Sequence, residues 1–361
     1  MMKKLALILS GITLLTSSAA IVFLNFNPLK SSGALEILEE KFFPQKNSLP
    51  ENMDRVSMVA VGDIMLSRNV GQKMETKGYE YPFAEVKNYL KTGDIVFGNL
   101  ETSITPGRII KTGETNFRAD IESAEALKNS GFNILSLANN HTPNFGQKGL
   151  IDTFKYLAEV EIKFMGAGKN ESEAYAPAHF KANGITFAFL AYNDTDVVPA
   201  SYGAGASRAG TAIMNTEKMK ADVIKEKTNN DFVIVSMHSG TEYVALPNKS
   251  QIDFARAAID AGADLIIGHH PHVVQSAEVY KDKYIFYSLG NFIFDQMWSE
   301  ETRRGLSLKI TFTKKQIEKI EFIPIKIFDY SQPKIISGDE AQKILNRLKL
   351  PLTEKNYIIT N

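Results

Sequence analysis

The sequence contains no cysteine, and this absence excludes several kinds of chemistry at once. Its 361 residues can form no disulfide, no thiolate metal site, no cysteine nucleophile and no acylated cysteine anchor. An excess of charge is also absent, because 41 basic residues balance 41 acidic ones. This balance gives no electrostatic case for nucleic acid as a partner. A hydrophobic content of 44% is normal for a globular protein with a sizeable core.

Histidine is scarce, with 6 residues in the chain, and three of them lie in the pentapeptide 268–272. The apolar run 263–267 before it predicts a buried strand, so these imidazoles follow the end of a strand. We expect Pro271 to push His270 towards an extended conformation. His270 and His272 could then surround one cation, since neutral imidazole is a common metal ligand. The alternative is an exposed loop whose histidines share no purpose.

Residues 1–26 are expected to anchor the chain in a membrane. Lys3 and Lys4 precede an almost unbroken apolar run of about 20 residues, which matches the hydrocarbon thickness of a bilayer. The lysines should stay in the cytoplasm, which places the rest of the chain outside. The alternative is a protein secreted after cleavage near residues 17–20, but the apolar run continues past them. Residues 27–54 are expected to form a stalk linker.

Beyond the stalk, short apolar runs alternate with amphipathic stretches, a rhythm that is typical of an α/β fold. The expected strands are 56–61, 94–101, 132–137, 185–192, 232–237 and 263–267, and the expected helices are 122–130, 149–160, 217–227 and 251–261. Further along, we expect one strand at 284–292 paired with 277–280, a hairpin of 306–312 with 317–328, and a helix at 339–348. We expect this C-terminal tail to close the second sheet.

Polar side chains recur where the expected strands end. Asp63 follows the first strand, and a carboxylate is a hard ligand for a divalent ion. Asn99 and Glu101 end the next strand and are two residues apart, so they share a face. Taken singly, each of these residues also fits an ordinary turn.

Two further strands end in the same way. The amide oxygen of Asn140 can bind a metal, and the neighbouring His141 can bind a metal or transfer a proton. His238 ends another strand, which leaves only His179 away from a strand end, and we interpret it as structural. A metal centre of carboxylate, amide and imidazole groups explains these coincidences together. Such ligands without thiolate favour Mn, Zn, Fe or Mg over Cu(I).

The segment 193–210 is long and rich in glycine, which is typical of a lid or an insertion. Arg208 is its only basic residue, and it could hold a carboxylate or phosphate group of a substrate. The alternative is an ordinary solvated surface arginine.

Six short motifs, taken in order between about residues 55 and 294, resemble the motif series of the CapA family. This family comprises capsule or poly-γ-glutamate synthesis proteins related to the calcineurin-like metallophosphoesterases. The motifs are Gly62-Asp63-Ile64-Met65, Gly98-Asn99-Leu100-Glu101, Asn139-Asn140-His141, His238-Ser239-Gly240, Gly268-His269-His270-Pro271-His272 and Ser288-Leu289-Gly290-Asn291-Phe292.

The resemblance implies a four-layer α-β-β-α sandwich with two mixed sheets, formed by a domain at 55–300 and completed by a hairpin and helix within 301–361. It also implies one or two divalent ions at the strand ends. The implied ligands are Asp63, Asn140, His238, His270 and His272, with Glu101 as a bridging or outer carboxylate. His141 would protonate the leaving group beside Asn140, and we assign substrate binding to Arg208 and Asn291.

Two positions depart from the wider phosphoesterase pattern. Met65 stands where the superfamily has a histidine, and Asn99 stands where it has a bridging aspartate. The first metal position would therefore lose an imidazole and a bridging charge. A single ion, or a weakly held second ion, becomes plausible, and a two-metal clamp cannot be assumed.

The leading hypothesis is a metal-dependent hydrolase or transferase that acts outside the membrane on an amide or phosphoester of an anionic polymer. Poly-γ-glutamate or another wall or capsule polymer would be the substrate, as the resemblance implies. The alternative is a non-catalytic subunit of a polymer synthesis or export complex with a degenerate metal site. A third hypothesis is an ordinary phosphatase, and it rests on analogy with the fold alone.

Overall fold

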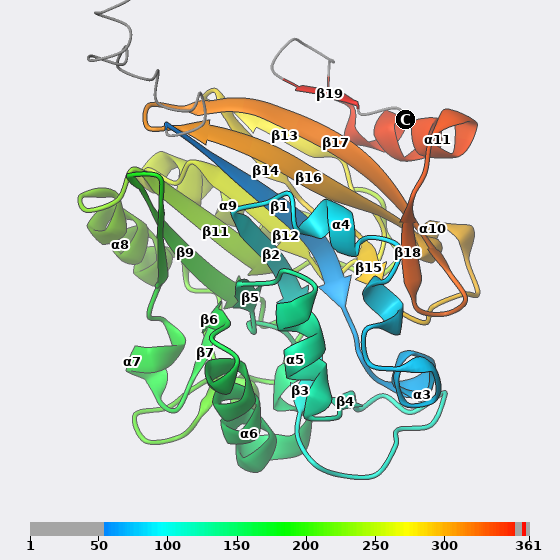
Figure 1. Cartoon of the computed structure of the whole chain (residues 1–361). Helices are drawn as coiled ribbons and strands as arrows, with labels where there is room; N and C mark the ends of the chain where they lie inside the picture. The colour runs from blue at the N-terminus through cyan, green and yellow to red at the C-terminus, as the bar shows by residue number, and fades with distance from the viewer. Residues whose placement is uncertain (1–53, 351–355, 359–361) are drawn as a thin grey trace, which may run out of the picture. The chain divides into compact units, whose positions relative to one another are not determined.

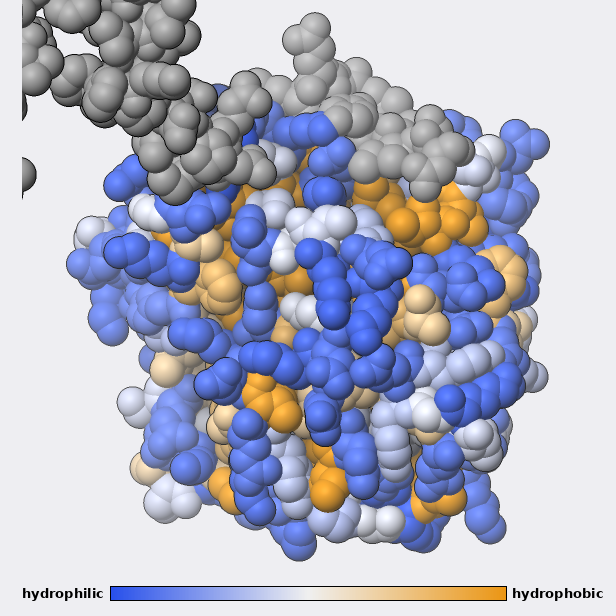
Figure 2. All heavy atoms as spheres, in the orientation of Figure 1, coloured by the Kyte–Doolittle hydropathy of each residue, from blue (hydrophilic) through white to orange (hydrophobic). Residues whose placement is uncertain are grey.

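The computed structural model describes residues 54–350 and 356–358. The expected anchor at 1–26 and nearly all of the expected stalk lie outside these residues and stay predictions. Within the described part, no helix has both the length and the apolar character needed to cross a bilayer. Most of the face seen in Figure 2 is hydrophilic, and its hydrophobic residues form small separate groups.

The first sheet has nine strands in the order β18-β17-β16-β1-β2-β5-β6, with β15 paired to β1 and β19 paired to β17. Its centre is parallel, whereas β16 pairs with β1 in the antiparallel direction and forms an antiparallel hairpin with β17. Figure 1 shows this late hairpin beside the first strand. The strands are β1 (Arg55–Ile64), β2 (Ile95–Leu100), β5 (Ile134–Ser136), β6 (Lys163–Met165), β15 (Asn291–Ile293), β16 (Arg304–Thr313), β17 (Ile317–Phe328), β18 (Gln332–Ile335) and β19 (Asn356–Ile358).

The second sheet has six strands in the order β13-β14-β12-β11-β9-β8. Its four inner strands are parallel and its two edge strands are antiparallel, so it is also mixed. The strands are β8 (Ala178–Ala182), β9 (Ile185–Asn193), β11 (Phe232–His238), β12 (Leu265–His269), β13 (Ala277–Tyr280) and β14 (Lys283–Phe286). Two small sheets pair β3 (Ser103–Ile104) with β4 (Arg118–Ala119) and β7 (Ala167–Gly168) with β10 (Gly210–Thr211).

Helices connect the strands, and α9 is capped at both ends. In α9 the side chain of Asn248 accepts a hydrogen bond from the backbone N–H of Gln251 at 2.9 Å, and Gly262 ends the helix with φ of 114°. Both features are standard signals for a helix start and stop. The helices are α3 (Arg68–Lys77), α4 (Lys87–Leu90), α5 (Glu122–Asn129), α6 (Gly146–Glu159), α7 (Glu171–Ala174), α8 (Thr216–Lys227), α9 (Lys249–Ala261), α10 (Glu300–Arg303), α11 (Gly338–Leu348), and the 3-10 turns η1 (Tyr81–Phe83), η2 (Thr142–Phe145) and η3 (Ala200–Tyr202).

Alternation along β1 shows how the layers are built. Met58 and Ala60 point into a core shared with the second sheet, whereas Val59 and Val61 point into a core shared with α5 and α6. A third core packs the other face of the second sheet against α8 and α9. Because side chains alternate with a period of two, each sheet buries both faces. The expected α/β fold with two mixed sheets is therefore confirmed.

Two expectations about the C-terminal half were wrong. The expected strand 284–292 is divided, since β14 lies in the second sheet and β15 pairs with β1 in the first. The chain crosses between the sheets at Ser288–Gly290, where Gly290 has φ of 69°. The late hairpin extends the first sheet rather than closing the second, because β16 pairs with β1.

Candidate metal centre

Polar side chains from both sheets meet at the edge where the parallel strands end. Asp63 lies beside Asn99 in the pairing of β1 with β2, and His238 lies beside His269 in the pairing of β11 with β12. Contacts between the sheets join these pairs, since the backbone N–H of His270 donates to Asp63 Oδ2 at 3.3 Å. The set that the structure brings together is Asp63, Asn99, Glu101, Asn140, His141, His238, His269, His270 and His272.

Asp63 is fully buried and lies at the centre of the cluster. Its Oδ1 accepts a hydrogen bond from Asn99 Nδ2 at 2.9 Å and lies 3.2 Å from His269 Nδ1, while its Oδ2 lies 3.5 Å from His272 Nδ1. Burial raises the pKa of Asp63, but the neighbouring imidazoles of His269 and His272 outweigh burial and hold the pKa well below its usual value. Asp63 is therefore an ionised carboxylate in a dry site.

Glu101 provides a second buried carboxylate, and one of its oxygens has no hydrogen-bond partner among the described residues. This atom, Oε1, lies 3.8 Å from His272 Nε2 and 3.8 Å from His141 Nε2. These separations are too long for hydrogen bonds. Two ligands bound to one ion at about 2.1 Å lie roughly 3–4 Å apart. The gap between Glu101 and His272 therefore has the dimensions of an ion site.

The two carboxylates also set the charge of His272. Burial lowers the pKa of His272, but Glu101 and Asp63 outweigh it and raise the pKa to about 9. A protonated imidazole thus supplies positive charge to the buried carboxylates, a role that a divalent cation would fill more completely.

Asn99 faces the cluster with its amide nitrogen, and Asn139 explains why. The backbone N–H groups of His141 and Thr142 donate to Asn139 Oδ1 at 3.0 and 2.7 Å, so Asn139 Nδ2 must point the other way. That nitrogen donates to Asn99 Oδ1 at 3.0 Å. Asn99 Nδ2 is left to donate towards Asp63 and towards His238 Nδ1 at 3.3 Å. At this position the chain therefore presents a hydrogen-bond donor to the cluster.

His238 and His270 line the side of the cluster nearest the second sheet. His238 Nε2 lies 3.0 Å from Asn140 Oδ1, a separation that suits two ligands of one ion. The two imidazole rings are 4.8 Å apart, and His270 Nδ1 has no hydrogen-bond partner among the described residues. Burial lowers the pKa of His238 and lowers that of His270 to about 4. Both imidazoles are therefore neutral near pH 7, which is the form that binds metals.

The expected extended conformation of His270 was wrong. His270 has φ of 99° and His272 has φ of 57°, which are unusual values for residues with a Cβ atom. Each costs on the order of 1–3 kcal/mol, and such strain gathers at functional sites. The hydrogen bond from His270 N–H to Asp63 and one from Tyr243 N–H to the carbonyl of Pro271, at 2.8 Å, hold the turn.

His141 lies on the opposite side of the cluster and is firmly oriented. Asn144 Oδ1 accepts from the backbone N–H of Phe117 at 2.8 Å and contacts His141 Nδ1 at 2.8 Å, so Nδ1 carries the proton. The imidazole stacks on Phe117 with ring centroids 3.8 Å apart. Burial lowers the pKa of His141 to about 4. Its Nε2 therefore presents a lone pair towards Glu101.

Arg68 is a residue of this site that the sequence reasoning missed. Its guanidinium lies 4.6 Å from the ring centre of Phe117, on whose ring His141 stacks, and it forms an ion pair with Asp295. Its Nε is buried without a partner among the described residues, and its φ is 49°. No histidine or metal-type motif marked this arginine in the sequence.

The two predicted substrate-binding residues lie in different surroundings. Arg208 is exposed, and its Nη2 donates to the carbonyl of Gly203 in its own loop at 2.8 Å. Asn291 is fully buried behind His272, whose Nδ1 contacts Asn291 Oδ1 at 2.9 Å. This contact turns His272 Nε2 towards Glu101, as a partner of a metal ligand does. The substrate roles of both residues stay predictions.

The residues present fit a divalent ion. Glu101 Oε1 and His270 Nδ1 are buried polar atoms without partners in the part of the chain that the structure describes, and such atoms are costly unless a ligand or water satisfies them. The donor atoms form two groups, and within each group all donor atoms lie within 4.8 Å of one another. The first group is Asp63, Glu101 and His238, and the second is Glu242, His270 and His272. The donors are carboxylate oxygen and imidazole nitrogen, which suit Mn, Fe or Zn.

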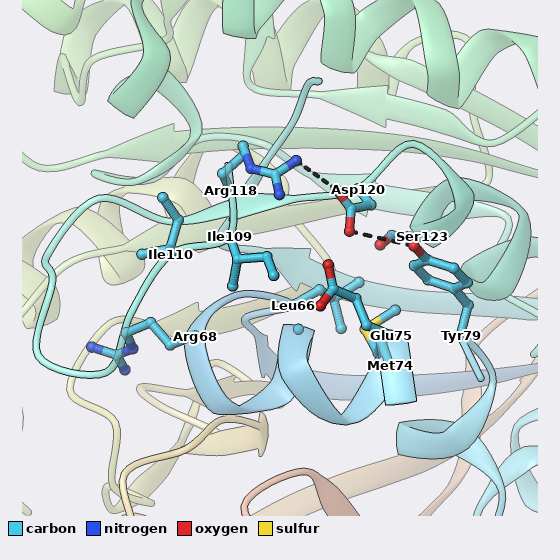
Figure 3. A pocket seen from close by; sticks show the side chains of 11 residues that line it. Leu66, Arg68, Met74, Glu75, Tyr79, Ile109, Ile110, Arg118, Asp120 and Ser123 are labelled. Carbon is cyan, nitrogen blue, oxygen red and sulfur yellow. Dashed lines mark hydrogen bonds and ion pairs between the residues drawn. The ribbon is translucent and has the colours of Figure 1, made fainter. Parts of the chain in front are cut away.

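A pocket between α3 and the 105–123 segment is not part of this cluster. Figure 3 shows Arg118 pairing with Asp120 there, while the Arg68 side chain extends away from that pair. Arg118 also donates to the carbonyl groups of Arg108 and Thr105 at 2.7 and 2.9 Å. Its guanidinium is occupied by these contacts, so it stabilises the segment rather than offering a free cation.

The fold and this site define an α/β protein with a candidate metal centre at its strand ends, and comparison with known proteins gives its family. Residues 57–296 match the family described as bacterial capsule synthesis protein PGA_cap. The capsule biosynthesis protein CapA of Bacillus anthracis is 34% identical over 82% of this chain and 73% of its own length. The PGA biosynthesis protein CapA of Bacillus subtilis is 35% identical over 81% and 77%. The chain therefore belongs to the PGA_cap family, and the resemblance found in its motifs is confirmed.

Solved structures share parts of the fold at low sequence identity. A hypothetical protein from Thermus thermophilus matches with a TM-score of 0.49 and 14% identity over 75% of this chain and 99% of its own. The calcineurin-like phosphoesterase YfkN from Bacillus subtilis matches with a TM-score of 0.41 and 12% identity over 81% and 96%. Because both scores lie below 0.5, these likenesses carry no weight for the function.

Proposed function

We propose that this protein is a CapA-like protein of capsule or poly-γ-glutamate synthesis. It would cleave an amide or phosphoester bond of an anionic polymer at a divalent metal centre, by hydrolysis or by transfer of the released group. The names of the Bacillus relatives support the biological setting. The single observation that carries the chemistry is Glu101 Oε1, which is buried, unpartnered and 3.8 Å from the Nε2 atoms of both His141 and His272.

The metal would be held by side chains from both sheets. When bound, a divalent ion supplies Lewis acidity and lowers the pKa of a water molecule. Asn291 would orient His272 by its hydrogen bond, and Asn139 would fix the amide of Asn99 beside Asp63. The proposed ligands are Asp63, Glu101, Asn140, His238, His270 and His272.

His141 is suited to move a proton. Its Nδ1–H is engaged by Asn144, so the bare Nε2 can take a proton from water or a hydroxyl group. The imidazolium formed in this way can then give the proton to the leaving group. Stacking on Phe117 keeps the ring in place between these steps.

Arg68 is suited to hold the negative charge of such a substrate. Its guanidinium lies against the ring of Phe117, and the imidazole of His141 stacks on the same ring. Asp295 accepts from Nη2, whereas Nε has no partner among the described residues. Arginine binds carboxylate and phosphate groups with two parallel donors.

The cellular location that we propose rests on the sequence of residues 1–26, which lie outside the described residues. We propose that residues 1–26 anchor the chain in the cell membrane with the α/β domain outside, where a synthase or export complex would be its partner. Secretion after cleavage of this segment is the alternative. Membrane fractionation of a C-terminally tagged chain, followed by external protease treatment of intact cells, tests the anchor and the orientation together.

A second candidate function is a non-catalytic subunit of a polymer synthesis or export complex. The observation that favours it is the amide of Asn99, which donates to Asp63 Oδ1 and contacts His238 Nδ1 inside the cluster. Met65 adds to this, because its side chain packs in the apolar core beside the helices instead of offering an imidazole. A site altered at positions 65 and 99 could bind a polymer without cleaving it.

The deciding experiment measures turnover by the purified full-length chain loaded with Mn²⁺ or Zn²⁺. The substrates are a γ-glutamyl peptide and a chromogenic phosphodiester, and the variants are His141→Ala and His179→Ala. His179 is a matched control because its side chain is 55% exposed and pairs with Glu226, away from the cluster. We expect turnover of one substrate to be lost in His141→Ala, with metal retained, and kept in His179→Ala.

Absence of turnover on both substrates by a fully loaded wild type would reject catalysis and leave the non-catalytic function. Turnover of the phosphodiester alone would support an ordinary phosphoesterase.

A further inference from the structure

We propose that Glu242, on the loop after β11, is a metal ligand that forms an ion site with His270 and His272. This inference rests on the proposed metal-dependent function and adds a ligand that no motif in the sequence marked. The three residues offer donor atoms that all lie within 4.8 Å of one another. The site would lie on the solvent side of the buried carboxylates.

Burial differs sharply among the three residues. His270 and His272 are 5% and 2% exposed, whereas Glu242 is exposed. His270 Nδ1 is buried without a partner among the described residues, and a buried polar atom needs a hydrogen-bond partner or a metal ion. A carboxylate that approaches from solvent can complete an ion site without the cost of burying another charge.

The loop that carries Glu242 is fixed to the segment that carries the two histidines. Tyr243 N–H donates to the carbonyl of Pro271 at 2.8 Å, between His270 and His272 in the sequence. Gln275 Nε2 donates to the carbonyl of Val244 at 2.8 Å. Because these bonds lie one and two residues after Glu242, its backbone is held beside the segment that carries the imidazoles.

The neighbouring side chains restrict where the carboxylate can go. The ring of Tyr243 lies 6.1 Å from the ring of His272 and 4.8 Å from that of Trp298, and its hydroxyl accepts a hydrogen bond from Gln296 at 3.2 Å. The ring of Tyr243 therefore packs beside the His272 imidazole, on the loop that carries Glu242.

The chemistry of the donor set indicates which ions it would take. Two imidazoles and one carboxylate suit Mn²⁺, Fe²⁺ and Zn²⁺, whereas Mg²⁺ prefers oxygen ligands alone. The ligand from the exposed loop would lie on the side from which ions and substrate enter. Glu242 would also supply an anionic donor in a cluster where Asn99 and Met65 supply none.

The test is a titration of Mn²⁺ into the metal-free full-length chain, followed by calorimetry and by the electron paramagnetic resonance of bound Mn²⁺. The variants are Glu242→Gln, His270→Ala and the control Glu161→Gln, which makes the same change on a side chain with 88% exposure far from the cluster. Thermal unfolding with chelator present checks that each variant folds. Because Glu242 is exposed, its variant should unfold like the wild type.

We expect Glu242→Gln to lose one bound ion per chain or to bind Mn²⁺ at least about tenfold more weakly, as loss of a metal-site residue does. Glu161→Gln should bind as the wild type does. If Glu242→Gln keeps the number of ions and an affinity within about twofold of the wild type, while His270→Ala loses binding, Glu242 is not a ligand and the metal centre itself stands. If the wild type binds neither Mn²⁺ nor Zn²⁺, the proposed function fails, and this inference fails with it.

Discussion

Replacing Asn139 with alanine should destabilise the protein and loosen the candidate metal centre together. Asn139 is fully buried, and its side chain makes five hydrogen bonds. Three come from the His141 and Thr142 backbone N–H groups and the Thr142 hydroxyl, and two go to Asn99 Oδ1 and the carbonyl of Leu100. At about 1 kcal/mol each, allowing for partial relaxation, their loss should cost about 3–5 kcal/mol.

That cost is a large part of the 5–15 kcal/mol by which a typical domain is stable. It is measured by urea unfolding followed by circular dichroism, with chelator present so that metal binding does not contribute. The control is Ser136→Ala in β5, because Ser136 is 1% exposed and its hydroxyl has no partner among the described residues. We expect the control to change stability by less than about 1 kcal/mol. Equal losses in the two variants would refute the role given to Asn139.

Four further changes have definite expected outcomes. Arg68→Lys keeps the charge but loses the planar fork, so KM for an anionic substrate should rise about tenfold with metal content unchanged; an unchanged KM would remove Arg68 from substrate binding. His141→Gln should lower kcat at least about a hundredfold while elemental analysis finds the metal retained; equal kcat would contradict a proton-transfer role. Gly268→Ala should leave little soluble protein or lower the free energy of unfolding by more than about 3 kcal/mol, since a Cβ there would lie 1.9 Å from the carbonyl oxygen of Tyr287. The control Gly71→Ala should be tolerated, because no neighbour lies closer than 3.5 Å to its Cβ position. Mn²⁺ at about a hundred times its dissociation constant should raise the free energy of unfolding by about 2.7 kcal/mol, and a shift of the same size in His238→Ala would argue against this site.

The parallel strands and their polar ends could be predicted from the sequence because both depend on local pattern. The run 232–235 is continuously apolar, and β11 is buried along its whole length. Since parallel strands end at the same edge of a sheet, side chains that follow several strands must lie near one another. Asp63, Glu101 and His238 follow three such strands, and their donor atoms all lie within 4.8 Å of one another.

Features that depend on three-dimensional neighbours could not be predicted in the same way. The orientation of the Asn99 amide is set by Asn139, which is 40 residues away, and no periodicity reports it. The positive φ of His270 results from contacts with Asp63 and with the loop after β11. Glu242 was overlooked because it follows no strand pattern and becomes relevant only where its loop meets the His270–His272 turn.

The division of residues 284–292 between two sheets has a similar cause. Residues 284–287 are aromatic or β-branched, and Leu289 and Phe292 continue the apolar pattern, so the local pattern predicts one strand. Gly290 turns the chain with positive φ, and Gly62 of β1 allows the approach, because a Cβ at Gly62 would lie 1.8 Å from the Gly290 carbonyl oxygen. Two glycines that are distant in the sequence therefore decide which sheet the second half of the stretch joins.

The most direct test of the central claim is the metal content of the purified full-length chain, measured by elemental analysis beside His238→Ala, His270→Ala and the control His179→Ala. We expect at least one equivalent of Mn, Fe or Zn in the wild type and in His179→Ala, and its loss in the two cluster variants. Absence of metal from the wild type after reconstitution with Mn²⁺ and Zn²⁺, or its retention in both cluster variants, would contradict a metal centre at these strand ends.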